Sequence, residues 1–377
     1  MNPPRTTHEA LVALTTLTDL PSINPWRLRR LLWHHAPTEA LELLQQRKDL
    51  HPMVHRALDP AGLRTLRDEA RRVAVGAALE RCVAATVDVV PITDPRYPPA
   101  LIGDPEAPVV LFTRGDLGVL DARRVAIVGT RNATTAGRST AIEFGRELGA
   151  QGVTVVSGLA RGIDGAAHRG VRLAEGRPAG VVANGLDVAY PKQHRELWNW
   201  VAEAGVLLSE WPPGASPEPW RFPLRNRVIA ALAEVLIVVE SRSRGGSLIT
   251  ARAALDRGVP VMAVPGSVHN RAAEGTNALL QEGAHPATSV AEVFTSLGLT
   301  NCTQGRLPLD LRPTPTGLQR QVLEQCRDVP RTLDMLVAEL GCPVTDAALA
   351  ATKLVHDRWL VEAGGWFELA GSRLRVP

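Results

Sequence analysis

Apolar residues recur at helical spacing through the first 86 residues of the chain. Leucine and alanine return every three or four positions, and runs of β-branched residues are few. This spacing places apolar side chains on one face of a helix, as in LRRLLWHHAPTEALELLQQ and LRTLRDEARRVAVGAALERCVAA. We therefore expect a helical domain over residues 1–86, followed by an extended proline-rich crossing at PITDPRYPPALIGDPEAPVV.

The pattern changes over residues 87–297, where short continuous apolar runs alternate with segments of helix length. A run that is apolar on both faces is typical of a strand buried in a parallel sheet. Alternation of such strands with helices favours right-handed crossovers. We expect an α/β fold with a doubly wound, Rossmann-like parallel sheet. The predicted strands are VVLFT, VAIVG, VTVVSG, AGVVA, VLLSE, VLIVVE and PVMAVP.

The C-terminal part of the chain follows a predicted linker. Residues 298–315 carry prolines and glycines with few periodic apolar positions. Over residues 316–377, three short helical stretches precede WLVEAGGWFEL, which indicates two strands around Gly364 and Gly365. Three helices and a hairpin are typical of a winged helix. Its predicted recognition helix has few basic residues, so we expect either a contact with another protein or only weak binding to duplex DNA.

Composition narrows the class of protein. With 377 residues and 45% hydrophobic residues, the chain is long and apolar enough for several globular domains. The net charge of +3 identifies no partner. Of the 42 basic residues, all but Lys48, Lys192 and Lys353 are arginines. Arginine forks match phosphate oxygens, although a compositional bias of the genome explains them equally well.

The cysteines and the N-terminus indicate the cellular compartment in which the protein is expected. The four cysteines are scattered, with no spacing typical of a metal site or a redox motif. The N-terminus lacks a basic start followed by an apolar core, and no apolar run is long enough to span a bilayer. We expect a cytoplasmic protein with no membrane association, no metal and no cofactor.

Candidate chemistry follows the predicted strands. Ligands of a parallel sheet bind beyond the carboxyl ends of its strands, and here glycine or small polar residues follow each one. Several of these loops open directly onto helices, whose free N–H groups favour an anion. The residues that we expect around this anion are Gly129, Thr130, Arg131, Ser157, Gly158, Arg161, Gly245, Gly246 and Ser247.

Arginines and aromatic rings are expected at the same edge. So many guanidinium groups suggest a polyanion or an extended ligand. Bases of single-stranded nucleic acid stack on rings while arginines hold the phosphates. Phe222 can equally belong to the core, because large aromatic residues are usually mostly buried. The residues concerned are Arg221, Phe222, Arg225, Asn226 and Arg227, with Arg242 and Arg244 in a neighbouring loop.

Eight blocks of sequence carry a resemblance to a known family. They are GTRNATTAG, SGLARGIDGAAH, NGLDVAYP, LLSEWPPG, FPLRNRVIAAL, VVESRSRGGSLITA, VPGS and GTNALLQEGA. In this order and spacing they resemble the DNA-processing protein A family, also called Smf. The resemblance is dense over residues 92–297 and looser at both ends. There the family often carries a sterile-alpha-motif-like or helix-hairpin-helix domain and a winged helix.

The resemblance implies a non-enzymatic recombination mediator. Members of the family bind incoming single-stranded DNA, protect it and load the RecA recombinase during natural transformation, and a role in repair is also open. Carried over by position, the phosphate-binding arginine is Arg131, and the FPLRNR block supplies further contacts. Relatives act as homodimers through the Rossmann-like domain, and Leu279 and Leu280 fall where the family's dimer contacts lie. At the N-terminus, Ser22 and Asn24 replace the glycines of a phosphate-binding hairpin, so weak DNA binding is expected there.

Two alternative functions remain open from the sequence. GGSLITA is similar to the glycine-rich loop of nucleotide phosphoribohydrolases, but no carboxylate follows it before Asp256. A dinucleotide-dependent oxidoreductase would need a third fingerprint glycine, whereas seven other residues separate Gly129 from Gly137.

Overall fold

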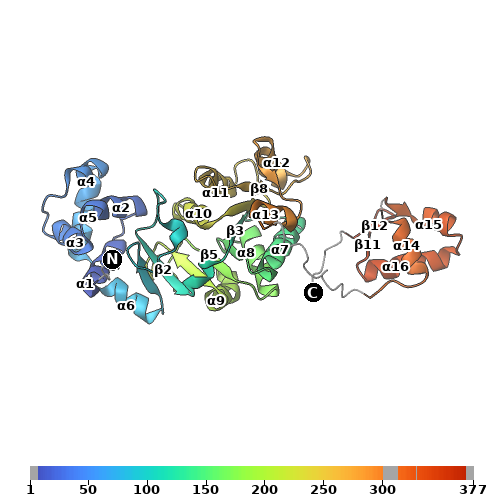
Figure 1. Cartoon of the computed structure of the whole chain (residues 1–377), viewed down its shortest axis with the longest axis horizontal. Coiled ribbons are helices and arrows are strands. Elements are labelled where there is room, and N and C mark those ends of the chain that lie inside the picture. The colour runs from blue at the N-terminus through green and yellow to red at the C-terminus, as the bar shows by residue number, and fades with distance from the viewer. Residues whose placement is uncertain (1–6, 300–312, 328, 371–377) are drawn as a thin grey trace. The chain divides into compact units, whose positions relative to one another are not determined.

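The computed structural model describes residues 7–299, 313–327 and 329–370 (Figure 1). The chain divides into two compact units, Met1–Thr300 and Asn301–Pro377. Residues 300–312 of the predicted linker lie outside the described residues.

Six helices form the N-terminal region of the first unit, as the apolar spacing predicted. Four of them begin at a proline, where a missing N–H and a fixed φ suit the first helical position. Their apolar faces pack into one cluster around Leu17, Leu31, Leu44 and Leu66. The helices are α1 (His8–Thr18), α2 (Pro25–His34), α3 (Pro37–Gln45), α4 (Pro52–Ala57), α5 (Pro60–Arg72) and α6 (Ala77–Ala84).

In the turn between α1 and α2, the N–H groups of Ser22 and Arg27 are engaged by side chains of the chain itself. The backbone N–H and the hydroxyl of Ser22 both donate to Glu69, at 3.1 and 2.7 Å. The side chain of Asn24 accepts from the N–H of Arg27 and caps α2. The assignment of this region to a sterile-alpha-motif-like or helix-hairpin-helix domain stays a prediction.

A nine-stranded sheet forms the rest of the first unit, in the order β1-β2-β6-β5-β4-β3-β7-β8-β9. All seven predicted strands are present, and the doubly wound α/β fold is confirmed. The strands are β1 (Asp88–Pro91), β2 (Val110–Gly115), β3 (Arg124–Val128), β4 (Thr154–Ser157), β5 (Pro178–Val181), β6 (Val206–Ser209), β7 (Val235–Val238), β8 (Val261–Ala263) and β9 (His285–Pro286).

One edge of the sheet corrects the prediction of purely parallel strands. β2 pairs antiparallel with both β1 and β6, whereas the strands from β6 to β9 along the sheet are parallel. A buried apolar run such as β2 has the same composition in either direction, so its pattern cannot give its orientation.

Helices cover both faces of the sheet, and the alternation along β3 shows how. Val125 and Ile127 face a core shared with α7, α8 and α13, while Ala126 and Val128 face one shared with α10, α11 and α12. The helix α9 packs in a third cluster that also holds the N-terminal helices. These helices are α7 (Thr135–Ala150), α8 (Ile163–Leu173), α9 (Arg195–Ala204), α10 (Arg221–Leu232), α11 (Gly246–Leu255), α12 (Glu274–Gln281) and α13 (Val290–Ser296).

Short 3₁₀ helices occur in four connections of this unit. They are η1 (Pro99–Leu101), η2 (Leu117–Asp121), η3 (Lys192–His194) and η4 (Arg271–Ala273).

The chain reverses its direction of travel across the sheet between β3 and β7. From β3 it winds through β4 and β5 to β6, and then returns to place β7 on the other side of β3. In doubly wound sheets the loops beyond such a pair of strands diverge and leave a crevice for a ligand. The fold therefore places the loops after Val128 and Val238 at the expected ligand position.

The second unit has its own small core around Val322, Leu336, Leu354 and Phe367. Its sheet has the order β10-β12-β11, and Gly364 and Gly365 turn the β11–β12 hairpin at φ values of 60° and 84°. Helices and hairpin occupy the predicted residues, while the winged-helix assignment stays a prediction. The elements are α14 (Leu318–Gln325), β10 (Arg331–Thr332), α15 (Leu333–Leu340), α16 (Val344–His356), β11 (Leu360–Ala363) and β12 (Trp366–Leu369).

No single helix in the described residues is long and apolar enough to cross a membrane. Within the part of the chain that the structure describes, one pair of helices, α15 and α16, reaches that length and composition when taken together, and the pair is bent by 119°.

Candidate nucleic-acid interface

A cleft of about 550 Å³ opens beyond the carboxyl ends of β3 and β7. Its walls come from the loop after β3, the start of α10 and the loop that leads from β7 into α11. Segments far apart in the chain, residues 128–131 and residues 222–250, meet here because the sheet reverses its winding at this point. The predicted residues that line the cleft are Gly129, Thr130, Arg131, Phe222, Arg225, Asn226, Gly245, Gly246 and Ser247.

An arginine stacked on an aromatic ring forms one wall of the cleft. The guanidinium carbon of Arg131 lies 4.3 Å from the centroid of the Phe222 ring. The ring of Tyr190 follows, with its centroid 5.8 Å from that of Phe222. Phe222, which the sequence left open between core and cleft, is half-buried in this wall. A cation and adjoining π-faces are thus presented together at an open surface.

Four arginines at this edge are exposed and lack an acidic partner. In the described part of the chain, no carboxylate oxygen lies within 4.0 Å of a guanidinium nitrogen of Arg131, Arg161, Arg242 or Arg244. Arg161 lines a smaller pocket of about 30 Å³, which adjoins the cleft through Arg131 and also contains the predicted Gly158. The charges of these four side chains are therefore available to an anionic ligand.

Arg225 supports the cleft from below and presents little surface. It is 4% exposed, and its guanidinium donates to the carbonyl oxygens of Gly158 (2.9 Å) and Val181. Burial lowers the pKa of Arg225 to about 10, against the pull of Asp164. The Asp164 carboxylate is itself buried and accepts the N–H of Gly158 at 3.2 Å. Burial raises the pKa of Asp164, while Arg225 and Arg131 oppose that shift.

A buried carboxylate occupies the N-terminus of α7, where a Rossmann-like fold usually holds a phosphate. Glu240, at the end of β7, accepts the N–H of Thr134 at 2.9 Å and also the hydroxyl of Thr134, the residue that caps α7. A Cβ at Gly137 would overlap this carboxylate, so only glycine fits there. The N-terminus of α7 is thus already occupied by the Glu240 carboxylate of the chain itself. Arg131 lies in the loop that precedes this helix.

The N-terminus of α11 opens into the same cleft. Gly246 is exposed, and a Cβ built on it would meet nothing within 4 Å. Asn226 donates from its amide to the carbonyl of Gly246 at 3.3 Å and so ties α10 to this turn. Ser247 is buried, and its hydroxyl donates to the Ser241 hydroxyl at 2.9 Å. Gly245 and Gly246 therefore present backbone to the cleft, whereas the hydroxyl of Ser247 is engaged inside.

Three of the predicted contact residues, Ser157, Arg221 and Arg227, do not line the cleft. The hydroxyl of Ser157 is fully buried and donates to the carbonyl of Ile127 at 2.5 Å, so it holds β4 to β3. Arg221 donates to the carbonyl of Ser216 and lies against the rings of Trp211 and Trp220, at 5.5 and 5.1 Å.

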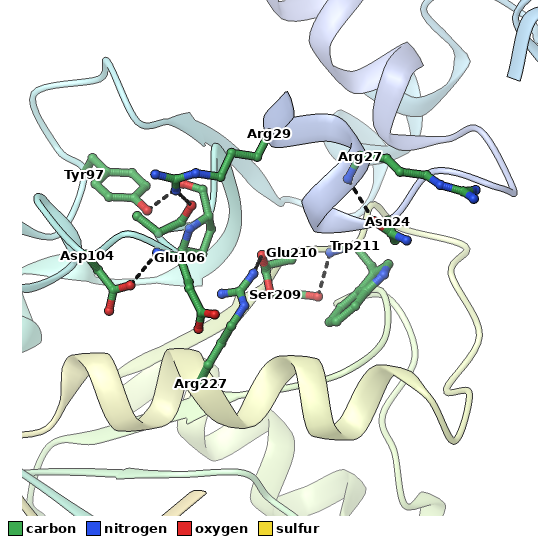
Figure 2. Close-up of polar contacts among 12 residues, drawn as sticks. Asn24, Arg27, Arg29, Tyr97, Asp104, Glu106, Ser209, Glu210, Trp211 and Arg227 are labelled. Atoms are coloured by element: carbon green, nitrogen blue, oxygen red, sulfur yellow. Dashed lines mark hydrogen bonds and ion pairs between the residues drawn. The ribbon is translucent and has the colours of Figure 1, made fainter. Parts of the chain in front are cut away.

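Arg227 is the clearest correction among the predicted DNA contacts. It is 7% exposed and points from α10 toward Glu210, with an ion pair of 2.6 Å (Figure 2). Side chains two positions apart in an α-helix point about 200° away from each other around the helix axis. Arg225 and Arg227 therefore lie on opposite faces of α10.

The predicted dimer contacts also need a correction. Leu279 is 7% exposed and packs in the core between the sheet and α12. Its neighbour Leu280 is half-buried and packs only at the edge of that cluster. Leu279 therefore belongs to the core of this chain and Leu280 is less buried, while a contact between subunits at these residues stays a prediction.

The sequence reasoning missed Glu240 and did not assign Tyr190. A carboxylate at the end of a strand, directly before SRSRGG, was the available signal for Glu240. Gly137 was a second signal, because a glycine within the first turn of a helix suggests a close approach. Tyr190 had only its place before Pro191, and its proximity to Phe222 arises from the fold.

The sheet and its cleft define a Rossmann-like α/β protein with an arginine-rich, aromatic-lined cleft at the switch point. Residues 88–298 match the family model described as DNA recombination-mediator protein A. The chain belongs to this family, as the sequence blocks predicted.

Relatives with known names agree with the family assignment. The chain is 41% identical to the DNA processing protein DprA of Bacillus subtilis over 212 residues, which is 56% of this chain and 71% of the relative. It is 38% identical to protein Smf of Escherichia coli over 210 residues, 55% of this chain and 56% of the relative.

Two solved structures are similar to the chain. The match with the DprA structure from Streptococcus pneumoniae spans 77% of this chain and 98% of the S. pneumoniae chain, with 29% sequence identity and a TM-score of 0.63. The DprA structure from Helicobacter pylori describes a single-stranded DNA binding mode. Its match spans 56% of this chain and 95% of the H. pylori chain, with 28% sequence identity and a TM-score of 0.50.

Proposed function

We propose that the cleft binds single-stranded DNA. Phosphates would lie along Arg131, Arg242 and Arg244, with bases against Phe222 and Tyr190. The observation that carries this proposal is the stack of Arg131 on Phe222 at 4.3 Å, in an open cleft with unpaired arginines. Stacking platforms beside cations are the general means of holding single strands without sequence preference. The H. pylori relative, whose structure describes single-stranded DNA binding, supports the proposal.

Engaged carboxylates argue against the two alternative functions. A dinucleotide would need the N-terminus of α7 for its pyrophosphate, but Glu240 already accepts there. A phosphoribohydrolase would need a free carboxylate beside the sugar. Asp164, the carboxylate that lines the cleft, is buried and bound to a backbone N–H. Binding without catalytic turnover therefore remains the better interpretation of this site.

The biological role that we propose follows the family. The protein would protect single strands and load RecA, in natural transformation and also in repair, within the cytoplasm. It would act as a homodimer through the Rossmann-like domain, with Leu280 at the contact. Duplex DNA should bind more weakly, because a stacking wall such as Phe222 needs unpaired bases.

Arg131→Ala tests the cleft directly. We expect about a 10-fold loss of affinity for oligothymidylate and a salt dependence reduced by about 0.7 in the log–log slope. The matched control is Arg172→Ala, since Arg172 is exposed near the C-terminal end of α8 and does not line the cleft. Fluorescence anisotropy over a series of salt concentrations measures both quantities.

Equal losses in the Arg131 and Arg172 variants would show that only net charge matters and would refute the site. The same samples can be assayed for RecA filament formation on the bound strand. If the wild-type protein binds DNA but leaves filament formation unchanged, then the binding function stands and the loading role is wrong.

A further inference from the structure

A second groove of about 590 Å³ lies beside the cleft, between α2, α10 and α11. The groove and the cleft share Pro223, Arg244, Gly245 and Ile249. The two hollows therefore adjoin at the N-terminal turn of α11.

The far wall of this groove carries an aromatic ring from the N-terminal helical region. Trp26, in the first turn of α2, is 42% exposed although it lies in the groove. The guanidinium carbon of Arg227 lies 5.8 Å from the centroid of its ring. Arg227 is in turn held by the buried carboxylate of Glu210, so its position against the ring is fixed. This arrangement repeats the arginine-on-ring stack of Arg131 and Phe222 in the cleft.

The N-terminal helices α2 and α6 are hydrogen-bonded to loops that flank strands of the nine-stranded sheet. Arg29 donates to the carbonyl of Ala107 at 2.7 Å (Figure 2), and Arg81 of α6 donates to the carbonyl of Pro213 at 2.9 Å. Trp26 is thus presented on a firmly held helix.

The charges along the groove favour an anion at the end that meets the cleft. Arg244 is exposed and has no acidic partner among the described residues, and Arg252 pairs with Asp256 only at the surface, with both side chains more than half exposed. Such surface pairs exchange readily for a better partner. Deeper in the groove, Arg257 is fully matched by Asp104 and Glu106. Phosphates would therefore follow Arg244 and Arg252 along the rim, with a base toward Trp26.

We propose that a single strand of nucleic acid bound in the cleft continues over the N-terminus of α11 into the second groove, where a base stacks on Trp26. This inference rests on the proposed function of the cleft. It assigns the N-terminal helical region a contact through an aromatic side chain, separate from the α1–α2 turn, where the N–H of Ser22 is engaged by Glu69.

The test measures affinity against length of oligothymidylate, from about 5 to about 16 nucleotides. The variants are Trp26→Ala and Arg252→Glu, the second at a highly exposed position where folding is not at risk. We expect both to bind the shortest strands like the wild type and to lose about 5- to 30-fold on the longest. Trp33→Ala is the matched control, because Trp33 is 70% exposed on the same helix and does not line the groove.

Each outcome separates the two proposals. If Trp26→Ala and Arg252→Glu gain affinity with length as the wild type does, the second groove is not used and the inference is wrong. An equal loss in Trp33→Ala would also overturn it. If the wild type fails to bind, or if Arg131→Ala binds normally at every length, the proposed function of the cleft has failed instead.

Discussion

Two arginine-rich regions lie on either side of α10, and their chemistry is opposite. In the cleft, Arg131, Arg242 and Arg244 are exposed and have no acidic partner in the described chain. At the joint with the N-terminal helices, Arg227 and Arg257 are matched by the buried or half-buried carboxylates of Glu210, Asp104 and Glu106. The number of arginines in a region is therefore a poor guide to anion binding. What matters is how many of their charges remain unpaired.

The largest expected effect comes from breaking the pair at the joint. Glu210→Ala leaves the guanidinium of Arg227 buried without a counter-charge, so the free energy of unfolding should fall by about 3–5 kcal/mol. Urea denaturation measures this change. The double variant Glu210→Met, Arg227→Met should recover most of the loss, because no charge then remains buried.

An exposed pair provides the control for this prediction. Asp256→Ala breaks the surface pair with Arg252 and should change the free energy of unfolding by less than about 1 kcal/mol. If Glu210→Ala were equally mild, the joint would not depend on charge compensation, and the contrast with the cleft would fail.

A smaller effect on the free energy of unfolding is expected from His168, a buried histidine that stays neutral because of its burial. His168 of α8 is fully buried, and no carboxylate among the described residues lies within 4.0 Å of its ring nitrogens. Burial lowers the pKa of His168 to about 3. Below a pH of about 6.5 the unfolded chain binds a proton here that the folded chain does not. Stability from this group is therefore full above pH 6.5 and falls toward pH 3.

The measurement is the free energy of unfolding against pH. Between pH 6.5 and pH 5, the wild type should lose about 2 kcal/mol through His168, and His168→Leu should lack this component. An unchanged pH profile in the variant would mean that the proton binds elsewhere.

The smallest expected effect is on affinity and leaves the fold intact. Phe222→Ala removes the ring under Arg131 and should weaken binding of oligothymidylate by about 1–2 kcal/mol, with the salt slope unchanged. Phe222→Trp keeps a stacking surface and should bind as the wild type does. A changed salt slope in Phe222→Ala would mean that the ring acts only by positioning Arg131.

The alternation of apolar residues was sufficient for much of the fold. Seven strands and the helices on either side of the sheet follow from periodicity, because burial of both strand faces leaves continuous apolar runs. The edge strands β1 and β9 were not predicted. In β1, three of four residues are buried, but the strand ends at Pro91, where the proline-rich stretch begins, so it has no pattern of its own. In β9 there are only two residues, and both are exposed.

The sequence by itself determined which loops end the strands, and hence that Gly129, Arg131 and Gly245 line one cleft. Only the tertiary structure decided the fate of individual charges. Arg225, Arg227 and Arg131 are alike in the sequence, yet one supports the floor of the cleft, one is neutralised by Glu210 and one is free. The reason is that burial and pairing depend on groups distant in the chain, whereas periodicity records only neighbours.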